Sequence, residues 1–138
     1  MNELTSPHKK IGESFVSLVS IIEKLRSPGG CPWDAKQTHK SLKPNILEEV
    51  YELLEAIEKN DSQAILEELG DILLQVIFHS EIAKASREFD VQTVCEKITS
   101  KMIKRHPHVF SKNRDTFNVK KAEDVEDNWE SFKRSASG

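Results

Sequence analysis

The sequence contains little of what disulfide-rich, membrane-spanning or β-sheet proteins need. Its 138 residues include two cysteines, five glycines, five prolines and 7% aromatic residues. Cys31 and Cys95 lie far apart and form no paired motif, which indicates neither a zinc ribbon nor a disulfide framework. The N-terminal residues MNELTSPHKK carry no apolar signal core, and no apolar stretch approaches the length of a membrane span. We therefore expect a cytoplasmic protein without a membrane partner.

Strong charge and phosphate-binding motifs are also missing. The net charge is −3 with 31% charged residues, a balance that gives no reason to expect a nucleic-acid partner. The sequence contains no glycine-rich phosphate loop, no G-x-S-x-G and no H-E-x-x-H. No histidine has a glutamate three positions before it, which excludes the Glu-x-x-His pairs of di-iron bundles. Any phosphate would therefore be held by a metal ion and basic side chains.

The sequence is rich in helical periodicity. Apolar residues recur at helical spacing in four segments: 11–26, one that starts between Ser41 and Asn45, 61–87, and 91–105. A more polar segment from Val119 can form a last helix, and no segment alternates as a strand would. The predicted fold is all-α, a helical bundle of four main helices plus a C-terminal helix. We expect residues 1–10 to be frayed and residues 11–134 to form a single domain.

The segment 61–87 is apolar almost all round, which predicts that it is buried by its own bundle or by a second subunit. A narrow polar stripe nevertheless follows it, formed by Glu68, Asp71, Gln75 and His79. Carboxylates on a buried helix cost on the order of several kcal/mol unless they are paired or bound to a metal. The stripe therefore calls for a compensating partner.

Two pairs of carboxylates lie three positions apart, Glu49 with Glu52 and Glu68 with Asp71. Residues at this spacing share one helix face, so two antiparallel helices could bring all four together. Hard oxygen ligands of this kind suit Mg²⁺. The alternatives are a solvated acidic face or neutralisation by lysine and arginine. A single shared cation, however, explains both pairs at once.

Each of the two tryptophans could serve either in packing or in binding. Trp33 lies in the segment 31–40, which has no clear period, and a long irregular connection is more often functional than idle. Its indole could equally plug the core. Trp129, in the last helical segment, could pack on the bundle or stack on a base.

Basic residues gather at the end of the segment 91–105. Lys101, Lys104 and Arg105 occupy its last turn, where positive charge complements the helix dipole. The same side chains could instead clamp phosphate oxygens. The following His106-Pro107-His108 is a weak metal signal that fits a turn equally well.

Five blocks of the sequence occur in order: CPWDAKQTH at 31–39, EExxE at 48–52, ExxD at 68–71, KRHPHVF at 104–110 and NWE at 128–130. Together they resemble the MazG family of nucleoside triphosphate pyrophosphohydrolases. The resemblance extends from about Phe15 to Lys133. Longer members of the family carry two such domains in tandem, whereas this chain has room for one.

The resemblance implies an all-α protein that assembles as a homodimer or homotetramer through its helical core. It implies hydrolysis of a nucleoside triphosphate to the monophosphate and pyrophosphate, in nucleotide pool control or house-cleaning. The expected cofactor is Mg²⁺, with Mn²⁺ as a substitute, bound by the positions that match the family's ligands: Glu49, Glu52, Glu68 and Asp71. These four residues, with Glu48 as a supporting carboxylate or water-orienting base, form the expected catalytic set.

The expected substrate contacts fall into two groups. Lys101, Lys104 and Arg105 would hold the outer phosphates. Contacts to the base and the sugar are expected from four residues: Trp33, Asp34, Gln37 and Trp129.

Two other functions stay open at this point. The chain could be a non-catalytic helical oligomer that binds nucleotides or a protein partner, or a purely structural acidic bundle. Release of pyrophosphate from triphosphates separates the enzyme from the first alternative. The effect of Asp71→Asn on stability and on the response to Mg²⁺ separates it from the second.

Overall fold

The computed structural model describes residues 6–136, with side chains for residues 6–134, and this part of the chain contains helices and no strand. The all-α prediction is confirmed. The elements are α1 (Ser6–Arg26), α2 (Pro32–Lys36), α3 (Lys43–Glu58), α4 (Ser62–Ala85), α5 (Val91–Arg105), α6 (Pro107–Phe110), the 3₁₀ helix η1 (Arg114–Phe117), α7 (Ala122–Asp127) and α8 (Trp129–Ala136). No helix in the described range is both long enough and apolar enough to cross a bilayer.

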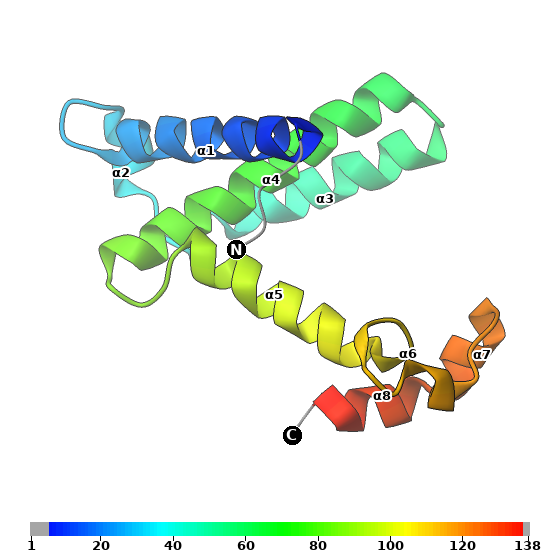
Figure 1. The fold of residues 1–138 in the computed structure, drawn as a ribbon. Coiled ribbons are helices and arrows are strands. Elements are labelled where there is room, and N and C mark those ends of the chain that lie inside the picture. Colours follow the sequence, from blue (N-terminus) through cyan, green and yellow to red (C-terminus); the bar gives the residue numbers. More distant parts are fainter. Residues whose placement is uncertain (1–5, 137–138) are drawn as a thin grey trace. The chain divides into compact units, whose positions relative to one another are not determined.

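The chain divides into two compact units, one ending at Val91 and one beginning at Gln92. The first unit contains α1 to α4, and the second contains nearly all of α5 and the shorter helices that follow it (Figure 1). The expectation of one functional domain over residues 11–134 stays a prediction.

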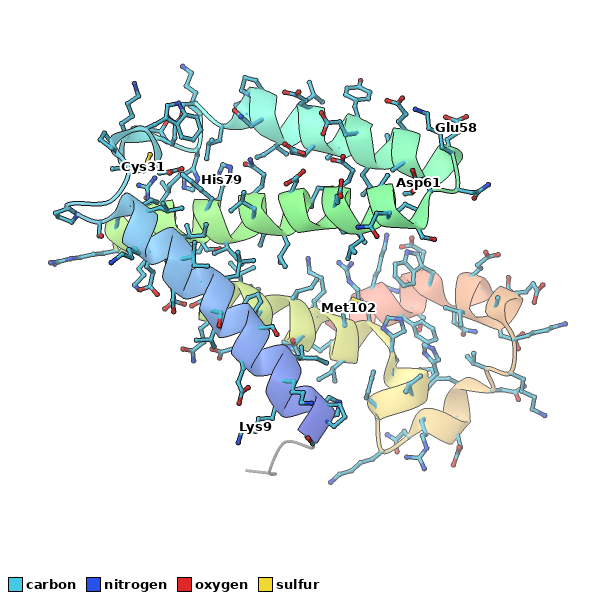
Figure 2. The ribbon with its side chains drawn as sticks, turned by 90° about the horizontal axis from the view of Figure 1, so that it is seen from above. Lys9, Cys31, Glu58, Asp61, His79 and Met102 are labelled. Carbon is cyan, nitrogen blue, oxygen red and sulfur yellow. The ribbon has the colours of Figure 1, made fainter. Side chains whose placement is uncertain are left out.

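The first unit is built on an antiparallel pair of helices, α3 and α4, which lie side by side (Figure 2). Glu58 and Asp61 mark the tight connection between them, and α1 packs against α4. The buried core consists of Ile22, Leu42, Ile77, Phe78 and Ile82. Around it pack the partly buried residues Phe15, Leu18, Val19, Leu25, Leu74 and Val91. The apolar stripe of segment 11–26 thus meets the C-terminal half of α4.

The second unit has a small core around Phe132, whose side chain is completely buried. The His108 ring stacks on Phe132 with 4.6 Å between ring centroids, and Phe117 meets it edge-on at 5.5 Å. Pro107 is also buried. The His106-Pro107-His108 sequence therefore begins a short helix, α6, and His108 packs as an aromatic ring.

Several helical elements differ from the sequence-based prediction. The first helix begins at Ser6 and not at Ile11, because Pro7 is tolerated in a first turn where its missing N–H is not needed. The remaining part of the expected frayed terminus, residues 1–5, lies outside the described residues. The segment 31–40, expected to be irregular, contains α2, which is too short for a periodic pattern to reveal it.

The C-terminal segment also differs, because it forms α7 and α8 and not one helix from Val119. Asn128 separates the two, with its side-chain amide donating to the Asp124 carbonyl oxygen at 2.7 Å. At the start of α7, the Asp124 carboxylate accepts backbone N–H groups of Lys120 and Lys121 at 2.9 and 3.2 Å. Local side-chain caps of this kind end and begin helices within a few residues.

Two glycines make the turn between α1 and α2. Gly29 has a φ of +83°, which other residues rarely adopt. At Gly30, an added Cβ would clash with the backbone oxygens of Lys24 and Leu25. The close approach allows the Cys31 N–H to donate to the Leu25 carbonyl at 2.7 Å, and this hydrogen bond ties the start of α2 to the end of α1.

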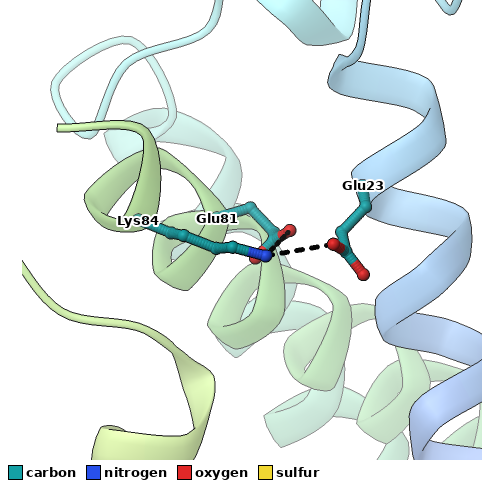
Figure 3. Close-up of polar contacts among 3 residues, drawn as sticks. All are labelled: Glu23, Glu81 and Lys84. Carbon is teal, nitrogen blue, oxygen red and sulfur yellow. Dashed lines mark hydrogen bonds and ion pairs between the residues drawn. The ribbon is translucent and has the colours of Figure 1, made fainter. Parts of the chain in front are cut away.

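Lys84 joins α1 to α4 (Figure 3). Its Nζ lies 3.0 Å from Glu23 Oε2 on α1 and 4.0 Å from Glu81 Oε1 on α4. Glu81 is only 7% exposed, and burial raises its pKa above the usual value even though Lys84 opposes the change. The buried Glu81 carboxyl therefore holds its proton more strongly than a glutamate in water does.

We expect Glu81→Gln to leave the protein at least as stable as the wild type at neutral pH. A raised folded-state pKa means that this carboxyl stabilises the fold when protonated and loses that contribution as the pH rises through the folded pKa. The advantage of the variant should therefore grow as the pH rises from the ordinary pKa of a glutamate through the raised pKa of the folded state. Urea unfolding at several pH values measures it. The exposed partner gives the control, since Glu23→Gln should cost less than about 1 kcal/mol.

Candidate functional site

Four carboxylates meet between α3 and α4. Glu49 and Glu52 come from successive turns of α3, and Glu68 and Asp71 from successive turns of α4. If one carboxylate oxygen is taken from each residue, the four oxygens all lie within 4.8 Å of one another. The spacing of three positions within each helix and the antiparallel pairing of the helices bring the four together, as the sequence pattern predicts.

The electrostatics of this acidic cluster are unfavourable without a cation. The pKa of Glu49 is raised to about 7, by burial first and then by the charges of Asp71, Glu52, Glu68 and Glu48. The pKa of Glu68 is also raised, by burial first and then by the neighbouring carboxylates of Glu52 and Asp71. Within the described residues, no lysine or arginine forms an ion pair with the four carboxylates. Lysine and arginine side chains in this part of the chain therefore do not neutralise the cluster, which was one of the alternatives left open by the sequence.

The cluster fits a divalent cation. Glu49 Oε2 and Glu68 Oε2 are buried acceptors without a hydrogen-bond donor, and each comes from a different helix. Unpartnered carboxylate oxygens are expensive to bury, and an ion bound between them would satisfy both. Asp71 is exposed and leaves the cluster open to solvent on one side, which suits Mg²⁺ because this ion keeps some of its water ligands.

Glu48 differs from the four ligand candidates. Its side chain is exposed on α3, directly before Glu49. Its charge contributes to the raised pKa of Glu49, so it lies close enough to act on the cluster electrostatically. Its role as a water-orienting base stays a prediction.

Three of the four residues expected to contact the base or sugar lie on and just after α2. Trp33 is 50% exposed, and Asp34 is half-buried. Gln37 is buried, and its amide is already used inside the chain: Nε2 donates to the Trp33 carbonyl at 2.9 Å, and Oε1 accepts from Ser41 Oγ at 2.8 Å. These bonds point to a role for Gln37 in holding the segment, while Trp33 keeps a free surface.

Arg26 anchors the same segment from α1. Its Nη1 donates to the backbone carbonyls of Asp34 and Gln37 at 2.8 and 3.2 Å, and its guanidinium lies 5.2 Å from the centre of the Phe78 ring. The segment after the Gly29-Gly30 turn is thus fixed to both α1 and the core.

The remaining predicted contacts belong to the second unit. Lys101 and Lys104 are exposed on α5, and Arg105 is half-buried with a buried Nε that has no hydrogen-bond partner. Trp129 is half-buried, and the Lys133 ammonium lies 5.3 Å from the centre of its ring. This environment agrees with the first of the two alternatives for Trp129, in which the indole packs against the protein. The roles of all four residues in substrate binding stay predictions.

The sequence model of the MazG nucleotide pyrophosphohydrolase domain matches residues 37–110, more than half of the chain. The chain belongs to the MazG family. The matched range contains all four carboxylates of the acidic cluster. The resemblance carried by the five sequence blocks is therefore confirmed.

Other MazG proteins match over most of this chain. A *Thermotoga maritima* protein named nucleoside triphosphate pyrophosphohydrolase/pyrophosphatase MazG is 48% identical over 128 residues, which cover 93% of this chain and 50% of that protein. The nucleoside triphosphate pyrophosphohydrolase of *Escherichia coli* strain K12 is 39% identical over 117 residues, covering 84% and 43%. The chain therefore spans half or less of the length of these two relatives.

A solved structure supports the same fold. The crystal structure of a mazG-related protein from *Thermotoga maritima* matches with a TM-score of 0.67 at 29% identity. The match covers 86% of this chain and 97% of that chain. The helical architecture is thus that of a MazG protein.

No site role was predicted for Gln75, His79 and His39, which lie beyond the acidic cluster in the direction of the C-terminal end of α4. Gln75 and His79 continue the polar stripe of α4, and His79 Nδ1 lies 2.7 Å from Nδ1 of His39. Gln75 Oε1 and His79 Nε2 are both buried without a hydrogen-bond partner. The signal was present in the spacing of the stripe, but the contact between His39 and His79 crosses 40 positions and needs the fold.

We expect the stability of the metal-free protein to fall as the pH rises through about 7. The raised pKa of Glu49 means that the protonated cluster stabilises the fold and the ionised cluster loses that contribution. Asp71→Asn should reduce this loss because it removes one of the repelling charges. Thermal unfolding in EDTA at a series of pH values measures both.

The same experiment with added Mg²⁺ tests the fit of the ion. Binding to the folded state at a hundred times the Kd stabilises by about 2.7 kcal/mol, so the wild type should gain stability and Asp71→Asn should gain much less. Glu58→Gln, at the exposed end of α3, is the matched control and should respond to Mg²⁺ like the wild type. If the stability of the wild type changed with neither pH nor Mg²⁺, the result would contradict the metal site.

Proposed function

We propose that this MazG protein hydrolyses nucleoside triphosphates to nucleoside monophosphate and pyrophosphate with Mg²⁺ bound at Glu49, Glu52, Glu68 and Asp71. The observation that carries the proposal is the convergence of these four carboxylates from two helices, with two buried oxygens left unpartnered. The two relatives, which are both named nucleoside triphosphate pyrophosphohydrolases, support the reaction.

The chain's own part in the reaction is to hold and neutralise charge. Glu49 and Glu52 would supply metal ligands from α3, and Glu68 and Asp71 would supply them from α4. Mg²⁺ bound there would neutralise the triphosphate and lower the pKa of a coordinated water, and Mn²⁺ has similar ligand preferences. Glu48 would orient the attacking water from its exposed position beside the cluster.

The proposed substrate contacts outside the cluster are those predicted from the sequence, apart from Gln37, whose amide is bonded within its own segment. Trp33 would stack on the base, because half of its surface is exposed on a segment that Arg26 and Gln37 hold in place. Asp34 and Trp129 would add contacts to the base or sugar, and Lys101, Lys104 and Arg105 would hold the outer phosphates. We propose that this reaction serves nucleotide pool control or house-cleaning in the cytoplasm.

A purely structural acidic bundle is a weaker account of the cluster. In such a bundle, selection for stability would favour pairing the buried carboxylates with lysine or arginine or replacing them by neutral residues. The described residues offer the cluster no ion pair, and Glu49 has its pKa raised to about 7. An arrangement that disfavours its own charges is more typical of a site that binds a cation.

We also propose that the α3–α4 pair is covered by a second copy of the chain. Each helix carries an exposed apolar stripe spaced 3, 4 and 3 positions apart: Leu47, Val50, Leu54 and Ile57 on α3, and Leu66, Leu69, Leu73 and Val76 on α4. These side chains are between 40% and 63% exposed. Heptad-like spacing on two neighbouring helices suits packing against two more helices, as in a homodimer or homotetramer.

We expect pyrophosphate and a nucleoside monophosphate from at least one member of a panel of ribo- and deoxynucleoside triphosphates incubated with Mg²⁺. Asp71→Asn and Glu49→Gln should each lower turnover by at least about 100-fold, because each removes a ligand from the ion that stabilises the developing charge. Chromatography of the products measures both.

The control for this experiment is Glu58→Gln, the same change outside the cluster, which should keep wild-type turnover. Circular dichroism establishes that the variants remain helical. Binding of nucleotides without any product would favour the non-catalytic alternative, and activity that survives Asp71→Asn would remove the basis of the proposal.

We expect Leu54→Glu or Leu69→Glu to convert the wild-type oligomer to a monomer, because each would place a charge in the centre of the apolar contact. Light scattering after size exclusion measures the mass. Ile11→Glu, at a position on α1 that is 66% exposed, should leave the oligomer unchanged. A wild type that is monomeric at micromolar concentration would contradict the second copy.

A further inference from the structure

Four buried side-chain atoms without hydrogen-bond partners belong to α3 and α4. Two are the carboxylate oxygens of Glu49 and Glu68, and two are Gln75 Oε1 and His79 Nε2. On α4 the residues Asp71, Gln75 and His79 follow one another at intervals of four positions, which places them on one helix face. The unpartnered atoms thus continue from the acidic cluster along the same face, away from the α3–α4 connection and towards His79 (Figure 2).

The far end of this row is closed by His39. The two imidazole rings are nearly parallel, at 7°, with centroids 5.0 Å apart, and the Nδ1 atoms lie 2.7 Å apart. One Nδ1 must donate to the other, so the contact orients the His79 ring and leaves its Nε2 as the atom still available. Burial, together with the nearby His39, lowers the pKa of His79 and so favours the neutral form of its ring.

The row has the chemistry of a site for an uncharged, hydrogen-bonding group. A carboxamide and a neutral imidazole carry no charge to attract phosphate, whereas both form hydrogen bonds with hydroxyl and amide-like groups. An unpartnered buried acceptor costs about 1–3 kcal/mol, a cost that a ligand hydroxyl can remove. Neither atom is among the ligands of the acidic cluster, so the proposed metal leaves both unexplained.

The distances along the helix match the order of groups in a nucleotide. Gln75 lies one turn beyond Asp71, about 6 Å along the axis, and His79 lies another turn further. In a nucleoside triphosphate the sugar follows the first phosphate after a single ester oxygen and a methylene group, and the base follows the sugar. Phosphates held at the acidic cluster would therefore bring the sugar to Gln75 and the base towards His79.

We propose that Gln75 and His79 bind the nucleoside part of the substrate, with Gln75 Oε1 accepting a hydrogen bond from a sugar hydroxyl and His79 Nε2 contacting the base. This assignment rests on the proposed binding of the triphosphate at the acidic cluster. His39 is a positioning residue, because it acts on the ligand only through the orientation of His79.

The test compares the wild type with Gln75→Leu, which keeps the size of the side chain and removes its polar atoms. Calorimetry with Mg²⁺ measures the Kd of the α,β-methylene analogues of ATP, CTP, GTP and UTP, of their 2′,3′-dideoxy counterparts, and of inorganic tripolyphosphate. The variant should bind the ribonucleotide analogues about tenfold more weakly, the loss expected for one hydrogen bond. It should bind the dideoxy analogues and tripolyphosphate as the wild type does.

The matched control is Gln63→Leu, the same change at an exposed position in the first turn of α4, which should leave every Kd unchanged. An equal loss for tripolyphosphate and the ribonucleotide analogues, a loss that persists with the dideoxy analogues, or no loss at all would overturn the sugar contact. So would a wild type that binds none of the four ribonucleotide analogues.

A second measurement tests His79 without a substitution. The ¹⁵N shift of His79 Nε2 should move when the tightest-binding ribonucleotide analogue is added and stay unchanged with tripolyphosphate. A shift that responds equally to both, or to neither, would overturn the base contact. Because both measurements follow binding, they separate this assignment from hydrolysis: binding without turnover would overturn the proposed reaction and leave the nucleoside contacts standing.

Discussion

Mutual repulsion of four carboxylates between α3 and α4 is the constraint on which the first unit depends. Burial and neighbouring charges together raise the pKa of Glu49 to about 7, so the cluster opposes the helix pairing that creates it. The pairing persists because apolar residues elsewhere on the same helices, such as Ile77 and Phe78, bury their side chains against α1 and the start of α3. Strain of this kind is typical of a site whose missing partner is a ligand.

The helix α4 serves three surfaces at once. Its C-terminal half supplies Ile77, Phe78 and Ile82 to the core, its polar face carries the cluster and the row that ends at His79, and a third face leaves an apolar stripe exposed. This division explains why its sequence is apolar almost all round and yet includes charged residues. We expected the whole helix to be buried, but within a single chain only its C-terminal half is.

The segment that follows α1 is held by polar contacts more than by a core of its own. Gly29 and Gly30 allow a tight turn, Arg26 binds two backbone carbonyls, and Gln37 bonds within the segment. The result is an exposed Trp33 on a fixed backbone and a His39 placed against α4. Rigid support of this kind is what a binding residue on a short connection requires.

The sequence by itself determined the fold class, the four long helices, the two carboxylate pairs and, through five short blocks, the family. These are properties of residues close together in the chain, where helical periodicity and spacing act locally. Short elements such as α2, and the division of the last segment at Asn128, were not predicted, because side-chain caps and glycine turns outweigh periodicity over so few residues.

Only the tertiary structure decided which atoms remain without partners. Whether His39 reaches His79 across 40 positions depends on how the segment before α3 packs against α4. The same holds for the raised pKa of Glu49, which requires carboxylates from two helices to share one partly buried space. Contacts and burial of this kind are properties of packing, and local sequence patterns do not contain them.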